Sequence, residues 1–368
     1  MQGRKAFDTV RGWYKRFERP ISSLSLISGF VFDSLTLRRV DLFWDNVWVV
    51  VHLTIVTVAA VWLNLLKETD DEKRFWLVNV MQFFFGGILS TYLVFYFRSA
   101  TLSVSWPFIV ILAAAFIANE SLKHRYARLS FQIALLFLAF YSFAIYLLPI
   151  LLHEISTRVF LLSGAVSLVA IGCVMLIPAI FSRRHFAGWN GWRVVIAIVV
   201  VLVVMNGFYF LHLIPPLPLS LMDGDVYQTL VVNGPGQYTV QYEAQPAGGI
   251  LDTLADFVRS DQTVHLVPGD PLYAYTAIFS PTALDTDIIH EWQYYDATQN
   301  KWITRGRITL PVTGGADGGW RTFSKEFDIT AGPWRVNVLT PAGGIIGQLN
   351  FTVVTQSAEP QLTTQEII

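Results

Sequence analysis

Six long apolar runs precede a proline-rich turn in this chain, and they limit the folds that it can adopt. The runs cover residues 43–66, 75–97, 103–118, 129–152, 159–181 and 194–214, and the turn is Ile214-Pro215-Pro216-Leu217-Pro218. Five of the runs have the roughly 20 residues that a helix needs to cross about 30 Å of hydrocarbon. The third is shorter and crosses only with its flanks included. Because a single membrane anchor needs one such run, six runs predict a helical bundle in a lipid bilayer.

The composition indicates that the two parts of the chain have different surroundings. Mean hydropathy is +0.47, and only 14% of residues are charged, against about 25% in typical soluble domains. Residues 1–224 hold 19 Lys and Arg against 12 Asp and Glu, whereas residues 225–368 hold 7 against 15. A basic membrane part suits anionic lipid head groups on the cytoplasmic face. An acidic second part argues against nucleic acid as a partner.

The connections between the apolar runs alternate between many and few basic residues. In chain order they carry Lys67, Lys73 and Arg74, then Arg98 alone, then Lys123, Arg125 and Arg128, then Arg158 alone, and then Arg183, Arg184 and Arg193. The positive-inside rule assigns the richer connections to the cytoplasm, so the region after the last run is extracytoplasmic. The basic residues before position 20 require a cytoplasmic N-terminus. A cytoplasmic N-terminus and an extracytoplasmic second part are compatible if residues 20–37 cross the membrane as a seventh span. The alternative is that residues 20–37 form a re-entrant or interfacial segment.

We expect five parts along the chain. Residues 1–19 form an amphipathic cytoplasmic segment, 20–214 a bundle of six to seven transmembrane helices, 215–224 a proline-rich linker, 225–356 an all-β sandwich-like domain and 357–368 a polar tail. Strand candidates are short runs separated by Gly, Pro, Asn and Asp turns. They cover residues 238–243, 272–279, 288–295, 302–310, 321–329, 334–339 and 347–354, with a helical insertion at 250–258.

Three segments of the second part are similar to a known family. The runs IIHEWQYYD, GGWRTFSKEFDITAGPWRVNVL and GGIIGQLNF resemble the domain-of-unknown-function family 2914. The membrane part resembles bacterial members that place several helices before this domain, through ISGFVFDSLTLRRVD, SWPFIVILAAAFIANE and IPPLPLSL. The family carries no established activity or catalytic residues. The resemblance therefore implies only a setting, which is a multi-pass protein of the bacterial inner membrane with its β-domain in the periplasm.

The first polar group that is a candidate site lies at the start of the first strong apolar run. Asp41, Asp45, Trp48 and His52 fall on one helix face. Ionisable groups at membrane depth usually face the bundle interior or a water-filled cavity, so a proton path or cation site is one interpretation. Asp45 and His52 lie about 10 Å apart along the axis, too far for one metal ion. The alternative is an interfacial polar stripe paired with Arg38 and Arg39.

A second group lies at the connections that we expect on the outer side. It comprises His153, Glu154, Arg158, Arg98 and His212. A carboxylate near histidines can provide general acid and base catalysis on a lipid-linked substrate. The spacing does not show that these residues meet, and loop ends that contact water are the alternative.

A third group lies in the predicted β-domain. His290, Trp292 and Tyr294 alternate onto one strand face, Glu291, Gln293 and Tyr295 occupy the other, and Arg321 and Arg335 each follow a tryptophan. Aromatic rings beside His and Arg can hold a sugar ring or an anionic group. Alternatively, the tryptophans are core and the arginines pair with carboxylates. His290, Trp292, Arg321 and Arg335 are the candidates for ligand binding.

The motifs of common enzyme classes are absent from the sequence. It has no nucleophile elbow, HExxH, paired CxxC, Walker loop or dinucleotide glycine pattern, so we expect no cofactor and no metal. Two function classes remain. In the favoured one, the bundle anchors a β-sandwich that binds an envelope glycan, a lipid-linked polymer or a periplasmic protein. In the other, Asp41, Asp45, His52, His153, Glu154 and His212 contribute to a membrane-embedded enzyme or transporter.

Overall fold

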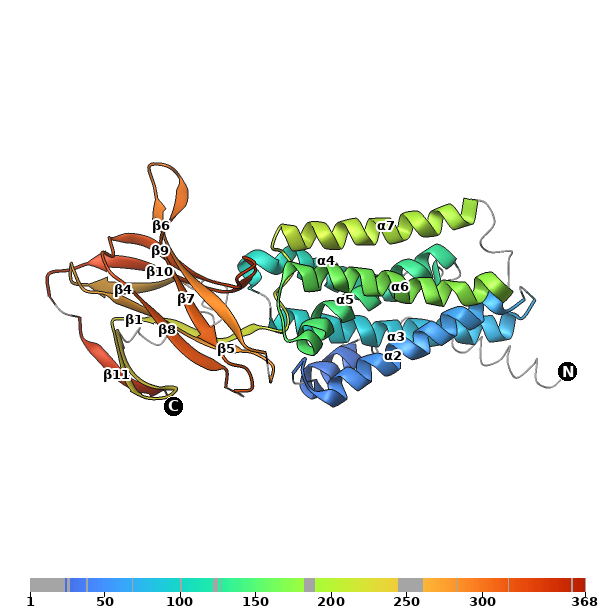
Figure 1. Cartoon of the computed structure of the whole chain (residues 1–368), viewed down its shortest axis with the longest axis horizontal. Coiled ribbons are helices and arrows are strands. Elements are labelled where there is room, and N and C mark those ends of the chain that lie inside the picture. The colour runs from blue at the N-terminus through green and yellow to red at the C-terminus, as the bar shows by residue number, and fades with distance from the viewer. Residues whose placement is uncertain are drawn as a thin grey trace. The chain divides into compact units, whose positions relative to one another are not determined.

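The computed structural model contains a helical unit and a β unit, which consists of residues 215–368 with the short segments Ser99–Val104 and His153–Ser156 (Figure 1). It describes residues 24, 27–37, 39–67, 69–99, 101–121, 125–126, 128–181, 189–243, 261–282, 284–316, 318–358 and 360–367. The long helices are α2 (Phe43–Leu65), α3 (Asp71–Arg98), α4 (Leu102–Ser121), α5 (Leu129–Leu152), α6 (Thr157–Phe181) and α7 (Trp189–Phe210). They match the six apolar runs. The order of helices followed by β structure that the sequence predicts is thus confirmed.

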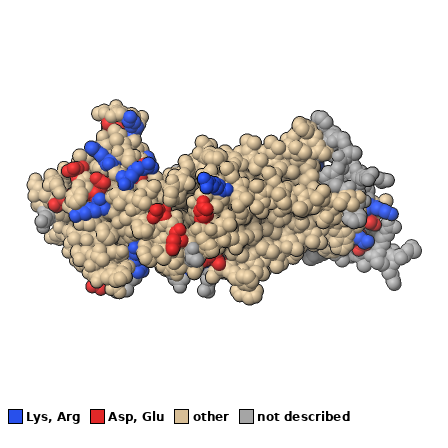
Figure 2. All heavy atoms as spheres, viewed as in Figure 1, with Lys and Arg blue, Asp and Glu red and all other residues tan. Residues whose placement is uncertain are grey.

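Five of these helices are long and apolar enough to cross a membrane, and α4 contributes a shorter apolar stretch at Val104–Asn119. Figure 2 shows a wide band without charged side chains along the visible flank of the helical unit. Many large apolar side chains point outward, including Val169 and Val203, which are 67% and 63% exposed. Apolar surface of this extent favours lipid rather than water as its surroundings.

A short helix over residues 27–36 packs against α3 and α4. Arg98 donates from Nη1 to the Leu37 carbonyl oxygen at 2.6 Å and from Nη2 to that of Ser34 at 2.7 Å. The ring centroids of Phe30 and Phe116 are 5.9 Å apart. The C-terminal end of this helix therefore lies beside the C-terminal end of α3, the side required for a seventh span. The ten helical residues 27–36 rise about 15 Å, and the crossing itself stays a prediction.

The described part of the β unit has eleven strands. They are β1 (Ser220–Tyr227), β2 (Thr229–Gly234), β3 (Gln237–Glu243), β4 (Asp261–Leu266), β5 (Leu272–Phe279), β6 (Thr286–Asp296), β7 (Lys301–Val312), β8 (Trp320–Glu326), β9 (Gly332–Leu339), β10 (Ile345–Thr355) and β11 (Leu362–Ile367). They form three sheets, ordered β1-β5-β8, β4-β10-β9-β6-β7 and β11-β3-β2. All seven strands predicted from the sequence are present.

The sheet β1-β5-β8 is the middle layer of the β unit. One of its faces and the five-stranded sheet enclose a core around Trp292, Trp334 and Phe351. Its other face packs against the third sheet through an aromatic cluster that includes Tyr238 and Tyr275. The alternation of side chains along β5 explains this, because Leu272 and Ala274 belong to the first core while Tyr275 and Ala277 belong to the second. The structure is therefore a two-sheet sandwich with a third sheet added.

Two predicted boundaries differ from the structure. Strand β1 begins inside the predicted linker 215–224, where Leu219 is fully buried. Strand β11 lies inside the predicted tail 357–368, because it pairs antiparallel with β3. These segments fold because partners distant in sequence supply their hydrogen bonds, which local composition does not reveal. The amphipathic segment 1–19 and the helical insertion 250–258 lie outside the described residues.

Candidate functional site

The buried face of β6 holds two of the residues predicted to bind a ligand. His290 and Trp292 are both fully buried between the sheets. Ser324 Oγ lies 2.8 Å from His290 Nδ1 and accepts a hydrogen bond from Trp292 Nε1 at 2.9 Å, while His290 Nε2 lies 3.0 Å from Thr276 Oγ1. All four groups are satisfied if the Ser324 hydroxyl donates to Nδ1 and Nε2–H donates to Thr276. This network belongs to the core and does not face a ligand.

Burial also sets the protonation state of this histidine. The apolar surroundings of His290 lower its pKa to about 4, because the charged imidazolium loses its hydration there. The ring is therefore neutral near pH 7. His290 and Trp292 hold the sheets together, which corrects their prediction as ligand-binding residues.

The opposite face of the same sheet carries a continuous set of polar side chains. We call this set the outer polar face; it consists of Glu291, Gln293, Arg335, Asn337 and Gln348. The strand register places them side by side, because Gln348 is opposite Asn337, Asn337 opposite Glu291 and Arg335 opposite Gln293. They come from three neighbouring strands, β10, β9 and β6.

Hydrogen bonds connect the members of the outer polar face. Gln348 Nε2 donates to Asn337 Oδ1 at 2.8 Å, and Asn337 Nδ2 donates to Glu291 Oε2 at 3.1 Å. Gln293 Nε2 also donates to Glu291 Oε2 at 2.9 Å, while Arg335 Nε donates to Gln293 Oε1 at 2.7 Å. Side chains fixed in this way lose little rotamer freedom when a ligand binds, which lowers the entropic cost of recognition.

Two aromatic rings adjoin this face at the β6–β7 hairpin. The guanidinium carbon of Arg335 lies 4.2 Å from the centroid of the Trp302 indole. The Tyr295 ring meets the same indole edge-on at 5.3 Å, and its hydroxyl donates to Asn300 Oδ1. Trp302 and Tyr295 are each partly exposed. Apolar ring surface and hydrogen-bonding groups therefore lie next to each other on one sheet.

The charges of the outer polar face nearly balance. Glu291 forms an ion pair with Arg307, in which Arg307 Nε lies 3.1 Å from Glu291 Oε1. Only 12% of the Glu291 side chain is exposed. Partial burial lowers the pKa of Arg335, and the nearby Glu291 carboxylate opposes this. A guanidinium nevertheless stays protonated at any physiological pH. The face thus offers donors and acceptors without a strong net charge.

Arg321, the fourth predicted ligand-binding residue, lies in a different place from Arg335. Its Nη1 donates to the Gly236 carbonyl oxygen at 3.2 Å, and its own carbonyl oxygen accepts from Tyr238 at 3.2 Å. Arg321 therefore contributes to the junction between the middle sheet and the third sheet. Of the four predicted residues, only Arg335 belongs to the outer polar face.

The polar stripe at the start of α2 divides between two environments. Arg39 pairs with Asp41 at 2.7 Å, and its backbone N–H donates to Asp45 Oδ2 at 3.4 Å. His52 is 4% exposed, and its Nδ1 lies 2.8 Å from the Trp48 carbonyl oxygen. The acids thus interact with the segment before the helix, while the histidine packs inside the bundle. The predicted pairing with Arg39 is observed for Asp41, and Arg38 lies outside the described residues.

The second predicted group is exposed. His153, Glu154, Arg158 and His212 are all on the surface, and Arg98 binds the carbonyl oxygens of Ser34 and Leu37. His153 and His212 have positive φ angles of 54° and 55°, as expected for single residues that end a helix. Within the described ranges, no cluster of three His, Cys, Asp or Glu residues is arranged to hold a metal ion.

The polar residues that the sequence did not single out as candidates for ligand binding lie on the second face of β6. Glu291, Gln293 and Tyr295 alternate with His290 and Trp292, so only one of the two sets could be buried. The size of tryptophan favours the Trp292 side as the core. What the sequence could not reveal is that Asn337 and Gln348 of other strands continue the row.

Comparison with known proteins supports the resemblance and adds no activity. A family described as "Protein of unknown function (DUF2914)" matches residues 285–353, which contain the whole outer polar face together with Trp302 and Tyr295. No curated protein matches this chain. Among solved structures, the Pseudomonas fluorescens alkylpurine DNA glycosylase AlkC bound to DNA containing an abasic site analog aligns at 10% identity over 86% of this chain and 99% of that chain. The TM-score of that alignment is 0.23, too low to carry an argument about fold or function.

Proposed function

We propose that this protein is a multi-pass protein of the bacterial inner membrane whose periplasmic β-domain binds a carbohydrate polymer of the cell envelope on the outer polar face. Apolar helices of spanning length support the membrane setting. The basic connections of the bundle support a cytoplasmic position for the Lys73 and Arg128 ends of the helices, and hence a periplasmic β-domain.

The observation that carries the binding proposal is the position of Trp302 and Tyr295 beside a row of amides, a carboxylate and a guanidinium. The C–H face of a sugar ring packs on aromatic rings, while its hydroxyl groups need paired donors and acceptors. Asn337 and Gln348 supply both within one hydrogen-bonded row.

The dimensions and charge of the face favour an extended, uncharged ligand. From Gln348 on β10 to the adjoining Trp302 on β7, the face and the indole extend over four strands, about 14 Å at the usual strand spacing. The second part of the chain carries 7 basic against 15 acidic residues, which disfavours a polyanion. A neutral polymer rich in hydroxyl groups fits this surface better than a lipid-linked phosphate.

The test is co-sedimentation of the full-length protein, in nanodiscs, with insoluble polysaccharides and with purified peptidoglycan sacculi. Trp302→Ala should weaken binding about tenfold or more if the indole is a central contact. Trp320→Ala is the matched control, because Trp320 is 38% exposed but lies on β8 of the middle sheet. Binding that is equally weak in both variants, or absent in the unaltered protein, would contradict the proposal.

A membrane-embedded enzyme or transporter lacks a comparable supporting observation. Such a site needs its acid and base within hydrogen-bond reach of one substrate. Arg39 contacts Asp41 and Asp45, and His52 Nδ1 lies beside the Trp48 carbonyl oxygen, so these contacts do not by themselves place an acid and a base around one substrate. Exposed loop residues such as Glu154 do not add an enclosed pocket.

A further inference from the structure

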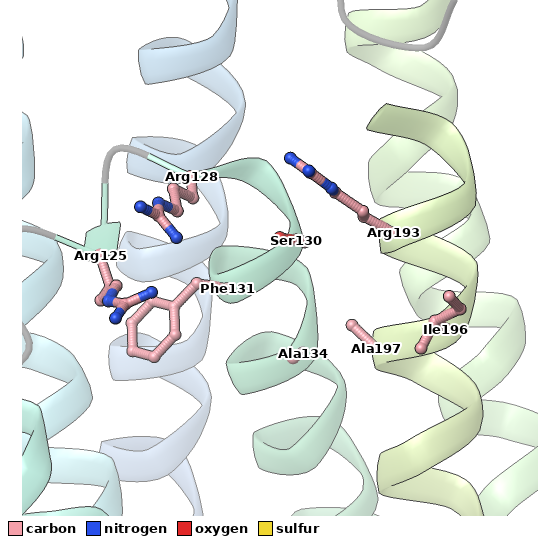
Figure 3. A pocket seen from close by; sticks show the side chains of 8 residues that line it. All are labelled: Arg125, Arg128, Ser130, Phe131, Ala134, Arg193, Ile196 and Ala197. Carbon is pink, nitrogen blue, oxygen red and sulfur yellow. The ribbon is translucent and has the colours of Figure 1, made fainter. Parts of the chain in front are cut away.

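A second surface feature lies at the opposite ends of the helices from Arg98. A cavity of about 410 Å³ opens between the first turns of α5 and α7. Figure 3 shows Arg128 next to the start of α5 and Arg125 on the turn before it, both extending on the side of α5 away from α7, and Arg193 projecting from α7 toward the start of α5.

The lining changes from charged to apolar along the helices. Three arginines form the rim, and none of the described residues that line the cavity is acidic. One to two turns further along, Ala134 of α5 and Ala197 of α7 face each other, while the Phe131 ring lies next to Arg125 (Figure 3). Their methyl groups add apolar surface to this part of the lining. The site therefore offers positive charge at the helix ends and apolar surface immediately next to it.

We propose that this cavity binds the headgroup of an anionic phospholipid, with an acyl chain lying along α7. Guanidinium groups bind phosphate oxygens through paired hydrogen bonds. Only 11% of the apolar window of α7 is buried, so its flank can contact the acyl chain. Basic pockets between helices on the cytoplasmic side of a membrane are suited to such headgroups. This inference rests on the proposed membrane setting and is independent of glycan binding.

The two parts of the ligand distinguish a lipid from a soluble phosphate. A free phosphate or pyrophosphate would use the arginine rim alone and leave the apolar part of the cavity filled with water. A phospholipid uses both, because its chain covers Ala134 and Ala197. The apolar lining is therefore the reason for choosing the lipid.

Native mass spectrometry of the full-length protein, released from mixed micelles, can count the lipids that stay bound. We expect phosphatidylglycerol and cardiolipin to be retained and phosphatidylcholine to be lost. Arg128→Gln/Arg193→Gln should lower retention about 25-fold, since each basic group near an anionic headgroup contributes about a fivefold change in affinity. Arg158→Gln is the control, because Arg158 is an exposed arginine at the other end of the neighbouring helix α6.

Three results would overturn the assignment. The first is that the unaltered protein retains phosphatidylcholine as well as it retains the anionic lipids. The second is that the double variant retains the anionic lipids as well as the unaltered protein does. The third is that millimolar pyrophosphate displaces the bound lipid and binds as tightly as the lipid. The first and third need no variant, so the proposal can be tested even if the double variant does not fold. Glycan co-sedimentation is a separate measurement, and a negative result there would not contradict the binding of an anionic lipid.

Discussion

Arg335 lies over the indole of Trp302, with its guanidinium carbon 4.2 Å from the ring centroid. The two residues come from strands that are not neighbours, because β6 lies between β9 and β7. The stacked pair therefore bridges β6, where the Arg335 guanidinium also bonds to Gln293. This contact joins the hydrogen-bonded side chains of the outer polar face to the aromatic rings of Trp302 and Tyr295 that adjoin it.

Arg335→Lys should weaken both the domain and glycan binding. A lysine ammonium lacks the planar group that stacks on Trp302 while donating to Gln293, so we expect a loss of about 1 kcal/mol in the free energy of unfolding. Arg307→Lys is the control; Arg307 lies on the same sheet, but its side chain is 59% exposed, so its loss should be smaller. Urea titration of the full-length protein, followed by proteolysis, measures the free energy of unfolding of each variant. Co-sedimentation measures glycan binding. Equal losses would show that the stacked geometry contributes nothing.

His290 should make the stability of the β unit depend on pH. Its pKa is about 4 in the folded protein and about 6.5 in an unfolded chain. Between these values the unfolded chain binds a proton that the folded protein does not, so stability is complete above about pH 6.5 and falls as pH is lowered toward 4. Over this pH range the free energy of unfolding falls by on the order of 3 kcal/mol.

The matching variant for this effect is His290→Gln, which keeps hydrogen-bonding groups but does not titrate. We expect the urea midpoint of the unaltered protein to fall more than that of the variant between about pH 7 and about pH 5. Because all other groups are shared, the difference isolates His290. The same shift in both proteins would contradict the assignment of a neutral buried ring.

A fragment that begins at Pro215 should fold, whereas one that begins at Asp225 should be strongly destabilised. The shorter fragment lacks the first half of β1, which pairs with β5, and it lacks the fully buried Leu219. Loss of this side chain alone removes about 2 kcal/mol of burial energy. Circular dichroism during thermal unfolding compares the two fragments. A cooperative transition of equal midpoint in both would show that β1 is dispensable.

Gly164→Ala should destabilise the helical unit, while Gly172→Ala on the same helix should not. A Cβ on Gly164 would lie 2.9 Å from the Tyr141 hydroxyl oxygen and 3.0 Å from Cζ, and Tyr141 is fully buried. We expect a cost of about 1–3 kcal/mol from overpacking. Nothing lies within 4 Å of a Cβ on Gly172, so alanine should be neutral or slightly stabilising there. The thermal midpoints of the two variants in detergent decide the question.

Cysteine labelling should place Lys73 and Ser357 on opposite sides of the membrane. Both are exposed in the structure, and Cys173 is the only native cysteine, so Cys173→Ala supplies the background. In intact cells an impermeant maleimide should label Ser357→Cys but not Lys73→Cys, because basic connections remain in the cytoplasm. Labelling of Lys73→Cys alone would reverse the topology and remove the glycan proposal.

The sequence predicts the elements that carry their own periodic signal. The six apolar runs correspond to α2–α7, and the alternating runs correspond to β3 and β5–β10. Strand β1 was missed because it contains Asp223, Gly224 and Asp225, residue types depleted in strands. Strand β11 was missed because its sequence LTTQEI is polar, and pairing with β3 alone makes it a strand.

The candidate site could be predicted only in part. Alternation along β6 separates His290 and Trp292 from Glu291 and Gln293, but it does not say which set is buried. The contribution of Asn337 depends on strand register across β6 and β9, which are joined by about 40 residues of intervening chain. Register of this kind is fixed by packing of the whole sheet, and no local pattern encodes it.

Strand β7 forms one edge of the five-stranded sheet and therefore presents unpaired backbone groups. Its edge carries the charges of Arg305 and Arg307, Pro311 near its end, and an irregular register where Gly306 meets β6. Charges, proline and bulges are the devices that stop edge strands from pairing between molecules. Copies of this protein would thus not pair through β7, and a long polymer bound by several of them at once would join them through avidity instead.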